Sequence, residues 1–233
     1  MPMMRIPRYP VRSYETTFER DEEPIDEGGM WLNGGKDGTD WVDVMTKGGV
    51  CYGAKSRMGV PEKRAEQGNL EGALPEGDYD DPTAVLTGEW GPDQHVTGTV
   101  FSRDPTNEYF QEVEIRLRST ITPNSCTGYE VFWRCLKTDE GYAEIVRWNG
   151  KIGDFTSLAR RVGPDFGVKD GDVVEATIVG DEIISYINGE EVLRATDATF
   201  ANGSPGVGFN FGVGDTNVDH GFTSFAVDTY EPE

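Results

Sequence analysis

Short runs in which apolar and polar residues alternate dominate this chain, and helical periodicity is nearly absent. The clearest run is Gln111–Arg118, in which Val113, Ile115 and Leu117 alternate with charged residues. Successive side chains of a strand point to opposite faces, so this run predicts a strand with one buried face. Its other face carries glutamates and arginines, which predicts a solvated ladder of opposite charges.

Other runs predict further strands, most of them in antiparallel pairs. These predicted strands cover Gly128–Leu136, Gly141–Trp148, Asp172–Val179, Glu182–Asn188, Gly206–Phe211 and Phe222–Thr229. The first two are joined by residues 137–140 and the next two by Gly180 and Asp181, which predicts two hairpins. Asn188 and Gly189 predict a further tight turn, because both residues tolerate positive φ. Short strands separated by turn residues are typical of an antiparallel sandwich or barrel.

The stretch 55–70 is the best candidate for a helix, but it contains Pro61 and many charges. A single helical turn or a long loop fits this stretch better than a packed helix. No internal repeat or interior linker interrupts the chain, and 233 residues suit one large β domain.

Residues 1–13 differ from the rest of the chain. They contain Arg5, Arg8 and Arg12, three prolines and no acidic residue, whereas the remaining chain has 18 basic and 42 acidic residues. This contrast predicts an extended basic arm, residues 1–13, followed by a sandwich domain, residues 14–233. The three arginines are candidates for contact with an acidic neighbour, either another subunit or another protein. A flexible terminus is the alternative.

The formal net charge of −21 limits the partners of the chain. A chain with this much negative charge repels nucleic acid and anionic membranes, so we expect neither as a partner. It disfavours polyanionic glycans unless a local basic cleft exists, and it attracts cations and basic protein segments. No run approaches 18 apolar residues, so no membrane insertion is expected. The first residues lack the apolar stretch of a secretory signal, which predicts a chain made in the cytoplasm.

Several segments, taken in their order along the chain, resemble the concanavalin A-like lectin/glucanase superfamily, and in particular its laminin G-like jelly-roll modules. The segments are Phe18–Trp31, Gly91–Val96, Tyr142–Gly150, Asp170–Val174, Tyr186–Glu190, Thr196–Thr199 and Gly203–Gly208. The resemblance implies an all-β fold, a two-sheet antiparallel jelly-roll sandwich. It implies little about activity, because this fold carries lectins, hydrolases, lyases and structural modules.

Glu112 and Glu114 are the candidate catalytic carboxylates, because they share one face of a strand and a glycosidase needs two carboxyl groups at one sugar bond. The related glucanases carry Glu-x-Asp-x-x-Glu, and this chain lacks the middle Asp and the last Glu. Polysaccharide lyases of this fold carry Arg-x-Glu-x-Arg with Gln-x-His. Here Glu114 with Arg116, and Gln94 with His95, keep only parts of that pattern. We therefore expect no catalytic residues and no enzyme.

Two acidic loops, residues 76–81 and 214–219, bunch the hard oxygen ligands that Ca²⁺ prefers. Laminin G-like modules often hold a Ca²⁺ ion at one rim of the sandwich, so the resemblance implies the same cofactor here. The candidate ligands are Asp78, Asp80, Asp81, Asp215 and Asp219. Neither loop matches an EF-hand, and acidic loops are expected in any chain of this charge.

Trp90 and Trp148 are the candidate ligand-binding residues, because each lies near a turn and sugars stack their CH faces on aromatic rings. Of the five tryptophans, these two fit an exposed position best, and a position in the core is the more frequent alternative for each.

The histidines and cysteines suggest no nucleophile. His95 is expected at a strand edge and His220 in a turn, far apart in sequence. Cys51, Cys126 and Cys135 are an odd number without a C-x-x-C pattern. Cys126 and Cys135 fit either a bridge across a hairpin or two small buried apolar residues.

These features together predict a non-enzymatic, lectin-like module for binding or assembly. The basic arm and the lack of an export signal suggest a virion component, such as a phage decoration, neck or fibre protein, or another particle-surface protein. The alternatives are a carbohydrate-binding lectin module, or a polysaccharide hydrolase or lyase.

Overall fold

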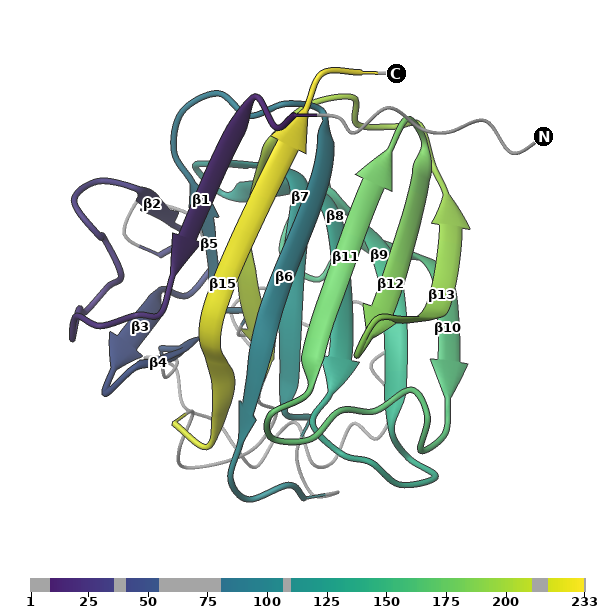
Figure 1. The fold of residues 1–233 in the computed structure, drawn as a ribbon. Coiled ribbons are helices and arrows are strands. Elements are labelled where there is room, and N and C mark those ends of the chain that lie inside the picture. Colours follow the sequence, from purple (N-terminus) through teal and green to yellow (C-terminus); the bar gives the residue numbers. More distant parts are fainter. Residues whose placement is uncertain (1–8, 36–40, 55–80, 107–109, 211–217, 233) are drawn as a thin grey trace.

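The structure is a computed structural model that describes residues 9–35, 41–54, 81–106, 110–210 and 218–232 (Figure 1). The stretch 55–70, considered above for a helix, lies outside the described residues. No helix among the described residues is long and apolar enough to span a membrane.

The described strands form two antiparallel sheets that pack face to face (Figure 1). Sheet A has the strand order β13-β12-β11-β6-β15-β4-β3, and β1 also pairs with β15. Its strands are β1 (Arg12–Thr16), β3 (Val44–Lys47), β4 (Val50–Gly53), β6 (Asp93–Ser102), β11 (Val173–Val179), β12 (Glu182–Ile187), β13 (Glu190–Thr196) and β15 (His220–Tyr230). The prediction of a two-sheet antiparallel jelly-roll sandwich is confirmed.

Sheet B lies behind sheet A in Figure 1 and has the strand order β10-β9-β8-β7-β14-β5-β2. Its strands are β2 (Trp31–Asn33), β5 (Thr83–Leu86), β7 (Glu112–Thr122), β8 (Ser125–Arg134), β9 (Tyr142–Gly150), β10 (Phe155–Val162) and β14 (Ser204–Asn210). The predicted strand over residues 111–118 is the first part of β7, at the middle of this sheet.

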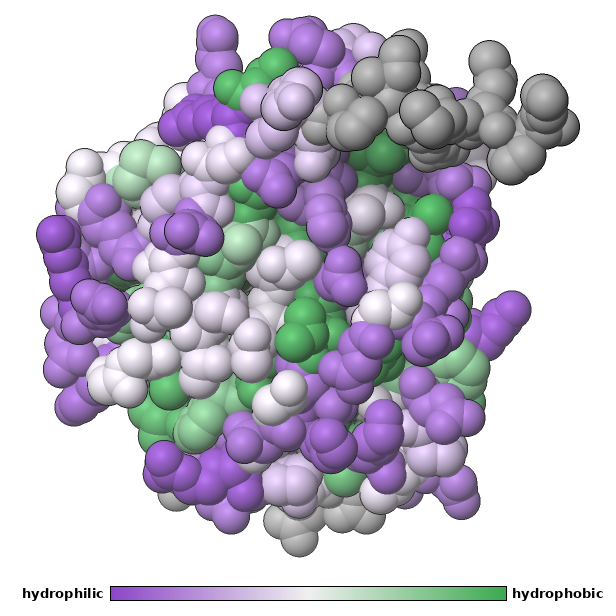
Figure 2. All heavy atoms as spheres, in the orientation of Figure 1, coloured by the Kyte–Doolittle hydropathy of each residue, from purple (hydrophilic) through white to green (hydrophobic). Residues whose placement is uncertain are grey.

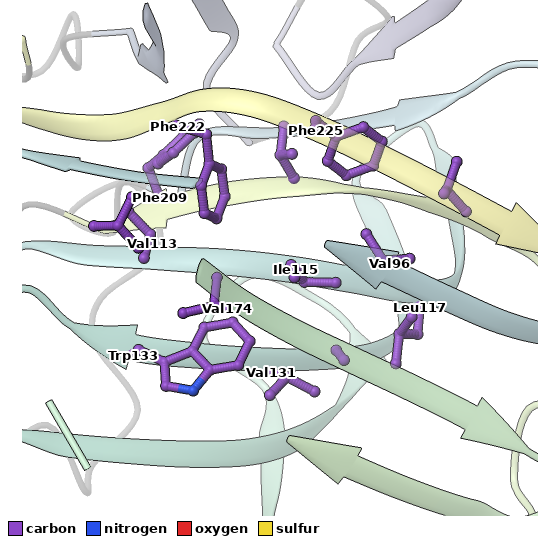
Figure 3. Close-up of a cluster of buried hydrophobic side chains, with 14 of the residues drawn as sticks. Val96, Val113, Ile115, Leu117, Val131, Trp133, Val174, Phe209, Phe222 and Phe225 are labelled. Atoms are coloured by element: carbon purple, nitrogen blue, oxygen red, sulfur yellow. The ribbon is translucent and has the colours of Figure 1, made fainter. Parts of the chain in front are cut away.

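Apolar side chains from the inner faces of both sheets fill the space between them (Figure 3). Sheet B contributes Val113, Ile115 and Trp133, and sheet A contributes Val96 and Phe222. The alternation in β7 therefore buries the residues that the sequence predicts to be buried. Burying such side chains is the main favourable contribution to folding, about 1.5–3 kcal/mol each.

The predicted hairpins are confirmed, since β8 pairs with β9 and β11 pairs with β12. Asn188 and Gly189 connect β12 to β13 with φ values of 53° and 80°. Both lie in the left-handed region that the turn requires, as predicted. The cysteines are free and buried, so the open question of a bridge between Cys126 and Cys135 is settled in favour of small buried side chains.

The outer face of β7 differs from its prediction. Glu112, Glu114 and Arg116 are buried instead of solvated. Arg118 has a φ of 45° at a bulge, and its guanidinium donates to the carbonyl oxygens of Pro92 and Phe200. The bulge thus separates Arg118 from the three charged residues that precede it.

The two histidines occupy strands. His95 lies in β6 with its Nε2 2.9 Å from Oε2 of Glu175. The prediction of a turn for His220 is wrong, because this residue begins β15 and is buried between the sheets. Its Nε2 contacts the carbonyl oxygen of Asn210 at 3.1 Å, and burial lowers its pKa to about 4.

Sheet A begins within the predicted arm. The Val11 amide donates to the carbonyl oxygen of Thr229 at 2.8 Å, and β1 starts at Arg12. Arg12 donates to the carbonyl oxygen of Glu89 at 2.8 Å, so this arginine contacts its own chain. Arg5 and Arg8 lie outside the described residues, and their role in partner contact stays a prediction.

Figure 2 shows the outer face of sheet A, where hydrophilic residues gather along the rim and the middle is paler. The half-buried residues Thr97 and Thr99 of β6 stand beside Ala226 and Ser224 of β15. This part of the face carries short uncharged side chains, in contrast to the outer face of sheet B.

We expect Gly189→Ala to destabilise the protein by about 1 kcal/mol, because a Cβ is disfavoured at positive φ even where no atom lies near it. Urea denaturation measures the change. Glu190→Ala, at the exposed next residue, is the control and is expected to have little effect. Equal stability of Gly189→Ala and the wild type would contradict the proposed turn.

Candidate functional site

The outer face of sheet B holds the candidate site, because alternate residues of β7, β8 and β9 point away from the core there. The register of β7 and β8 places Glu112 opposite Arg134 and Arg116 opposite Glu130. All four side chains are buried. A buried charge is costly unless it is paired, so the contacts of these residues define the chemistry of the face.

Arg116 lies at the centre of a buried ionic cluster. Its Nη2 is 2.6 Å from Oδ1 of Asp81, 2.7 Å from Oε2 of Glu130 and 3.3 Å from Oε2 of Glu114. The same nitrogen donates to Oγ1 of Thr83 at 2.8 Å. We call Asp81, Glu114, Arg116 and Glu130 the Arg116 cluster. One guanidinium thus joins carboxylates from β7, from β8 and from the segment before β5.

A glycine makes room for the Arg116 cluster, and two tryptophans lie against it. A Cβ at Gly208 of β14 would lie 2.2 Å from Oε2 of Glu114, so a larger residue does not fit without movement. Trp148 donates from Nε1 to Oε2 of Glu130 at 2.7 Å. Its ring packs edge-on against Trp41, and the Arg116 guanidinium lies 5.2 Å from the Trp41 ring. These contacts hold the guanidinium in place on the face of the sheet.

Three carboxyl groups beside one guanidinium leave an excess of negative charge if all of them ionise. Burial raises the pKa of Glu130 to about 8. Burial also raises the pKa values of Asp81 and Glu114, and it outweighs the opposing effect of Arg116. The cluster therefore retains protons at neutral pH.

The Arg116 cluster also resembles a metal site, because carboxylate oxygens of Asp81, Glu114 and Glu130 all lie within 4.8 Å of one another. However, Nη2 of Arg116 lies within hydrogen-bonding distance of all three and already supplies positive charge. The arrangement favours this internal cation over a bound metal ion.

Among the predicted Ca²⁺ ligands, Asp81 is therefore bound to Arg116. Asp78, Asp80 and Asp215 lie outside the described residues. Asp219 is half-buried beside the start of β15, and its carbonyl oxygen accepts a hydrogen bond from the Arg103 amide. Calcium binding by these loops stays a prediction.

A second group of side chains lies at the end of the same face, where β8 and β10 end and β9 begins, at the bottom of Figure 1. We call Phe110, Arg134, Tyr142, Arg160 and Val162 the Tyr142 patch. The Arg160 guanidinium lies 4.3 Å from the Tyr142 ring, and that of Arg134 lies 5.7 Å from the same ring and 5.3 Å from Phe110. Val162 stands opposite Tyr142 on β10. Phe110 is 41% exposed and Val162 is 56% exposed, whereas Tyr142 and Arg134 are buried.

Glu112 connects the Arg116 cluster to the Tyr142 patch. Its carboxylate accepts hydrogen bonds from the Tyr142 hydroxyl and from Nδ2 of Asn210, the latter at 2.8 Å. Burial, aided by the charges of Glu144 and Asp81, raises the pKa of Glu112 to about 7, although the two hydrogen bonds lower it. Glu112 therefore titrates in the neutral range.

Trp90 and Trp148 are both buried, so the alternative of a core position holds for each ring. Trp90 is buried in the main core, and the Arg12 guanidinium covers its ring at 3.8 Å. Trp148 is buried beside Glu130, as described above. A role of either ring in ligand binding stays a prediction, but neither is an open stacking platform in this structure.

The acids of β7 are not arranged for glycoside hydrolysis. Such hydrolysis needs two carboxyl groups that reach one sugar bond from opposite sides. Here Glu114 contacts Arg116, and Glu112 is bonded to Tyr142 and Asn210; both are buried. In the glucanase pattern Glu-x-Asp-x-x-Glu, counted from Glu112, the position of the middle Asp carries Glu114 and the position of the last Glu carries Leu117.

No family model matches the chain, and no curated protein matches it. Solved structures with a similar fold include the carbohydrate binding module CBM66 from Bacillus subtilis, with a TM-score of 0.54 and 12% identity over 90% of this chain and 98% of that one. A β-1,3-1,4-glucanase (lichenase) from a mouse hindgut metagenome has a TM-score of 0.51 and 11% identity over 95% and 99%. An endo-β-1,3-glucanase from Pyrococcus furiosus has a TM-score of 0.51 and 12% identity over 94% of each chain. The fold is thus a concanavalin A-like jelly-roll sandwich, as the resemblance in the sequence implies.

Sequence reasoning found the strand of Glu112 and Glu114 but missed their partners. Asp81 and Glu130 join Arg116 only through the order of strands in sheet B, which no local pattern reveals. Phe110 gives a weak signal, since it is an aromatic residue just before a predicted strand.

We expect Arg116→Met to destabilise the protein by about 3–5 kcal/mol at pH 8, because three buried carboxylates lose the guanidinium that they contact. The loss should be smaller at pH 5, where more of these carboxyl groups are protonated in any state. Urea denaturation at both pH values measures it, with the exposed Arg161→Met as the control. An equal loss at both pH values would mean that Arg116 contributes packing and not charge.

We expect the melting temperature of the wild type to fall as the pH rises from about 6.5 to about 8.5. In the folded state Glu112 and Glu130 keep protons up to pH values of about 7 and 8, whereas in the unfolded state they lose them near 4.3. The folded state then binds more protons, so stability falls as pH rises through these values. His220, with its lowered pKa, acts in the opposite direction below 6.5.

Glu112→Gln removes one of these titrating groups, so the melting temperature should depend less on pH. Glu15→Gln, on the exposed side of β1, should leave the pH dependence of the melting temperature unchanged. Differential scanning fluorimetry across this range is sufficient. A melting temperature that rises from pH 6.5 to 8.5 would contradict the buried protonated carboxyl groups.

Proposed function

We propose that this chain is a non-catalytic, lectin-like module that binds carbohydrate. The observation that carries the proposal is Arg116, which occupies the centre of the carboxylates on the outer face of sheet B. A hydrolase of this fold needs free carboxyl groups on that face. Here Glu114 contacts the Arg116 guanidinium, and Glu112 is bonded to Tyr142 and Asn210.

The similar folds support the carbohydrate part of the proposal. CBM66 is a carbohydrate-binding module, and the two glucanases also engage carbohydrate chains. The whole of CBM66 corresponds to this chain, so the comparison covers a complete binding module. The Tyr142 patch presents the exposed ring of Phe110 and the exposed guanidinium of Arg160 at one end of the face, and rings and hydrogen-bonding groups of this kind suit contact with sugars.

A polysaccharide panel tests the proposal. The purified protein is run in native gels that contain laminarin, lichenan, levan, xylan, mannan or polygalacturonate, with CaCl₂ and again with EDTA. We expect retardation by at least one polysaccharide and no new reducing ends after incubation. Retardation that EDTA abolishes would add Ca²⁺ as a cofactor.

New reducing ends would contradict the non-catalytic part, and Glu112→Gln and Glu114→Gln would then be tested for loss of cleavage. No retardation by any polysaccharide would contradict carbohydrate binding. It would favour the assembly role predicted from the basic arm, including a place on a virion or another particle.

A further inference from the structure

We infer that the Tyr142 patch is the carbohydrate-binding site and that it takes a neutral saccharide chain. This inference rests on the proposed function and adds the place and the chemical class of the ligand. Neither the similar folds nor the sequence motifs assign a role to Phe110, Arg134, Tyr142, Arg160 or Val162.

The first argument is the exposure of aromatic rings. Every tryptophan of the chain is buried, so none offers a face to a sugar. Among the described residues, the exposed aromatic side chains are Phe110 and Tyr9, and Tyr9 lies before the first strand. Phe110 is therefore the exposed ring that belongs to the sandwich, and Val162 adds apolar surface at the same end of sheet B.

The second argument is hydrogen-bonding capacity. The Arg160 side chain is 48% exposed, and its Nη1 donates to Oε2 of Glu144 at 2.6 Å. An arginine paired with a carboxylate offers donors and acceptors side by side, as neighbouring sugar hydroxyls require. Arg134 donates from Nη1 to the Glu140 carbonyl oxygen at 3.1 Å. Its guanidinium lies 5.3 Å from the Phe110 ring and 5.7 Å from the Tyr142 ring.

The third argument is rigidity. The Tyr142 hydroxyl is bonded to Glu112, and its ring carries the Arg160 guanidinium at 4.3 Å. The groups that would contact a sugar are thus held in place before binding. Preorganised groups lose less conformational entropy when a ligand binds, which favours affinity.

The fourth argument is charge, and it selects the ligand class. Within the patch, Arg134 pairs with Glu140 at 3.8 Å and Arg160 pairs with Glu144 at 2.6 Å. The patch is therefore close to neutral, within a chain of net charge −21. Such a chain repels polyanions at long range, and the patch provides no excess of positive charge to overcome this repulsion. A neutral saccharide meets no such barrier.

The test uses the full chain and the same polysaccharide gels, now with variants. Phe110→Ala and Arg160→Gln are each expected to weaken retardation by the bound neutral polysaccharide about tenfold, from loss of a ring contact or of hydrogen bonds to hydroxyls. Val173→Ala and Arg194→Gln are the matched controls on sheet A. Val173 is comparably exposed to Phe110, and Arg194 is 45% exposed and paired with Glu182 and Glu191, as Arg160 is with Glu144. Both controls should bind like the wild type.

The outcomes separate this inference from the proposed function. If Phe110→Ala and Arg160→Gln are retarded by a neutral polysaccharide as strongly as the wild type, the proposed site is wrong. Carbohydrate binding itself would still stand. Retardation by polygalacturonate alone would overturn the neutral class. No retardation by any polysaccharide would overturn the proposed function and this inference with it. The melting temperatures of the four variants are measured as well. If they are close to that of the wild type, a loss of binding is not caused by a loss of folding.

Discussion

The ion pairing of Arg116 with buried carboxylates is the constraint on which the outer face of sheet B depends. Asp81, Glu114 and Glu130 come from separate segments, and each approaches the same guanidinium nitrogen. Removing charges from water costs several kcal/mol per ion, so the face is stable only if the pairing is nearly complete. The small Gly208, the indole of Trp148 and the protons retained by the carboxyl groups all serve this requirement.

The same constraint shapes what the face can do. Carboxylates that neutralise an internal guanidinium are not free to attack a sugar or to bind a metal ion. The proposed carbohydrate site therefore lies at the end of the face, where Phe110, Arg160 and Val162 are exposed and Arg160 is paired with Glu144. Glu112 lies between these two regions, so its protonation state affects both the stability of the cluster and the support of Tyr142.

Much of the fold could be predicted from the sequence, because alternation and turn residues are local signals. The buried face of β7 follows from Val113, Ile115 and Leu117, and the hairpin turn follows from Asn188 and Gly189. The burial of Glu112 and Glu114 could not be predicted, since a charged residue in a strand is normally solvated. Glu114 is buried within the Arg116 cluster, and Glu112 is buried against Tyr142 and Asn210. These partners come from other strands and segments, so no local pattern reveals them. Trp90 and Trp148 lie near turns but are buried, since Arg12 covers the ring of Trp90 and Trp148 is bonded to Glu130 of β8. These partners come from other strands, so no local pattern identifies them.

A crystal structure of the protein grown with CaCl₂ tests the central claim most directly. The account predicts that Nη2 of Arg116 lies within hydrogen-bonding distance of Asp81 and Glu130, and that no metal ion lies among the carboxylates. A Ca²⁺ ion bound by Asp81, Glu114 and Glu130, with Arg116 displaced from them, would contradict it.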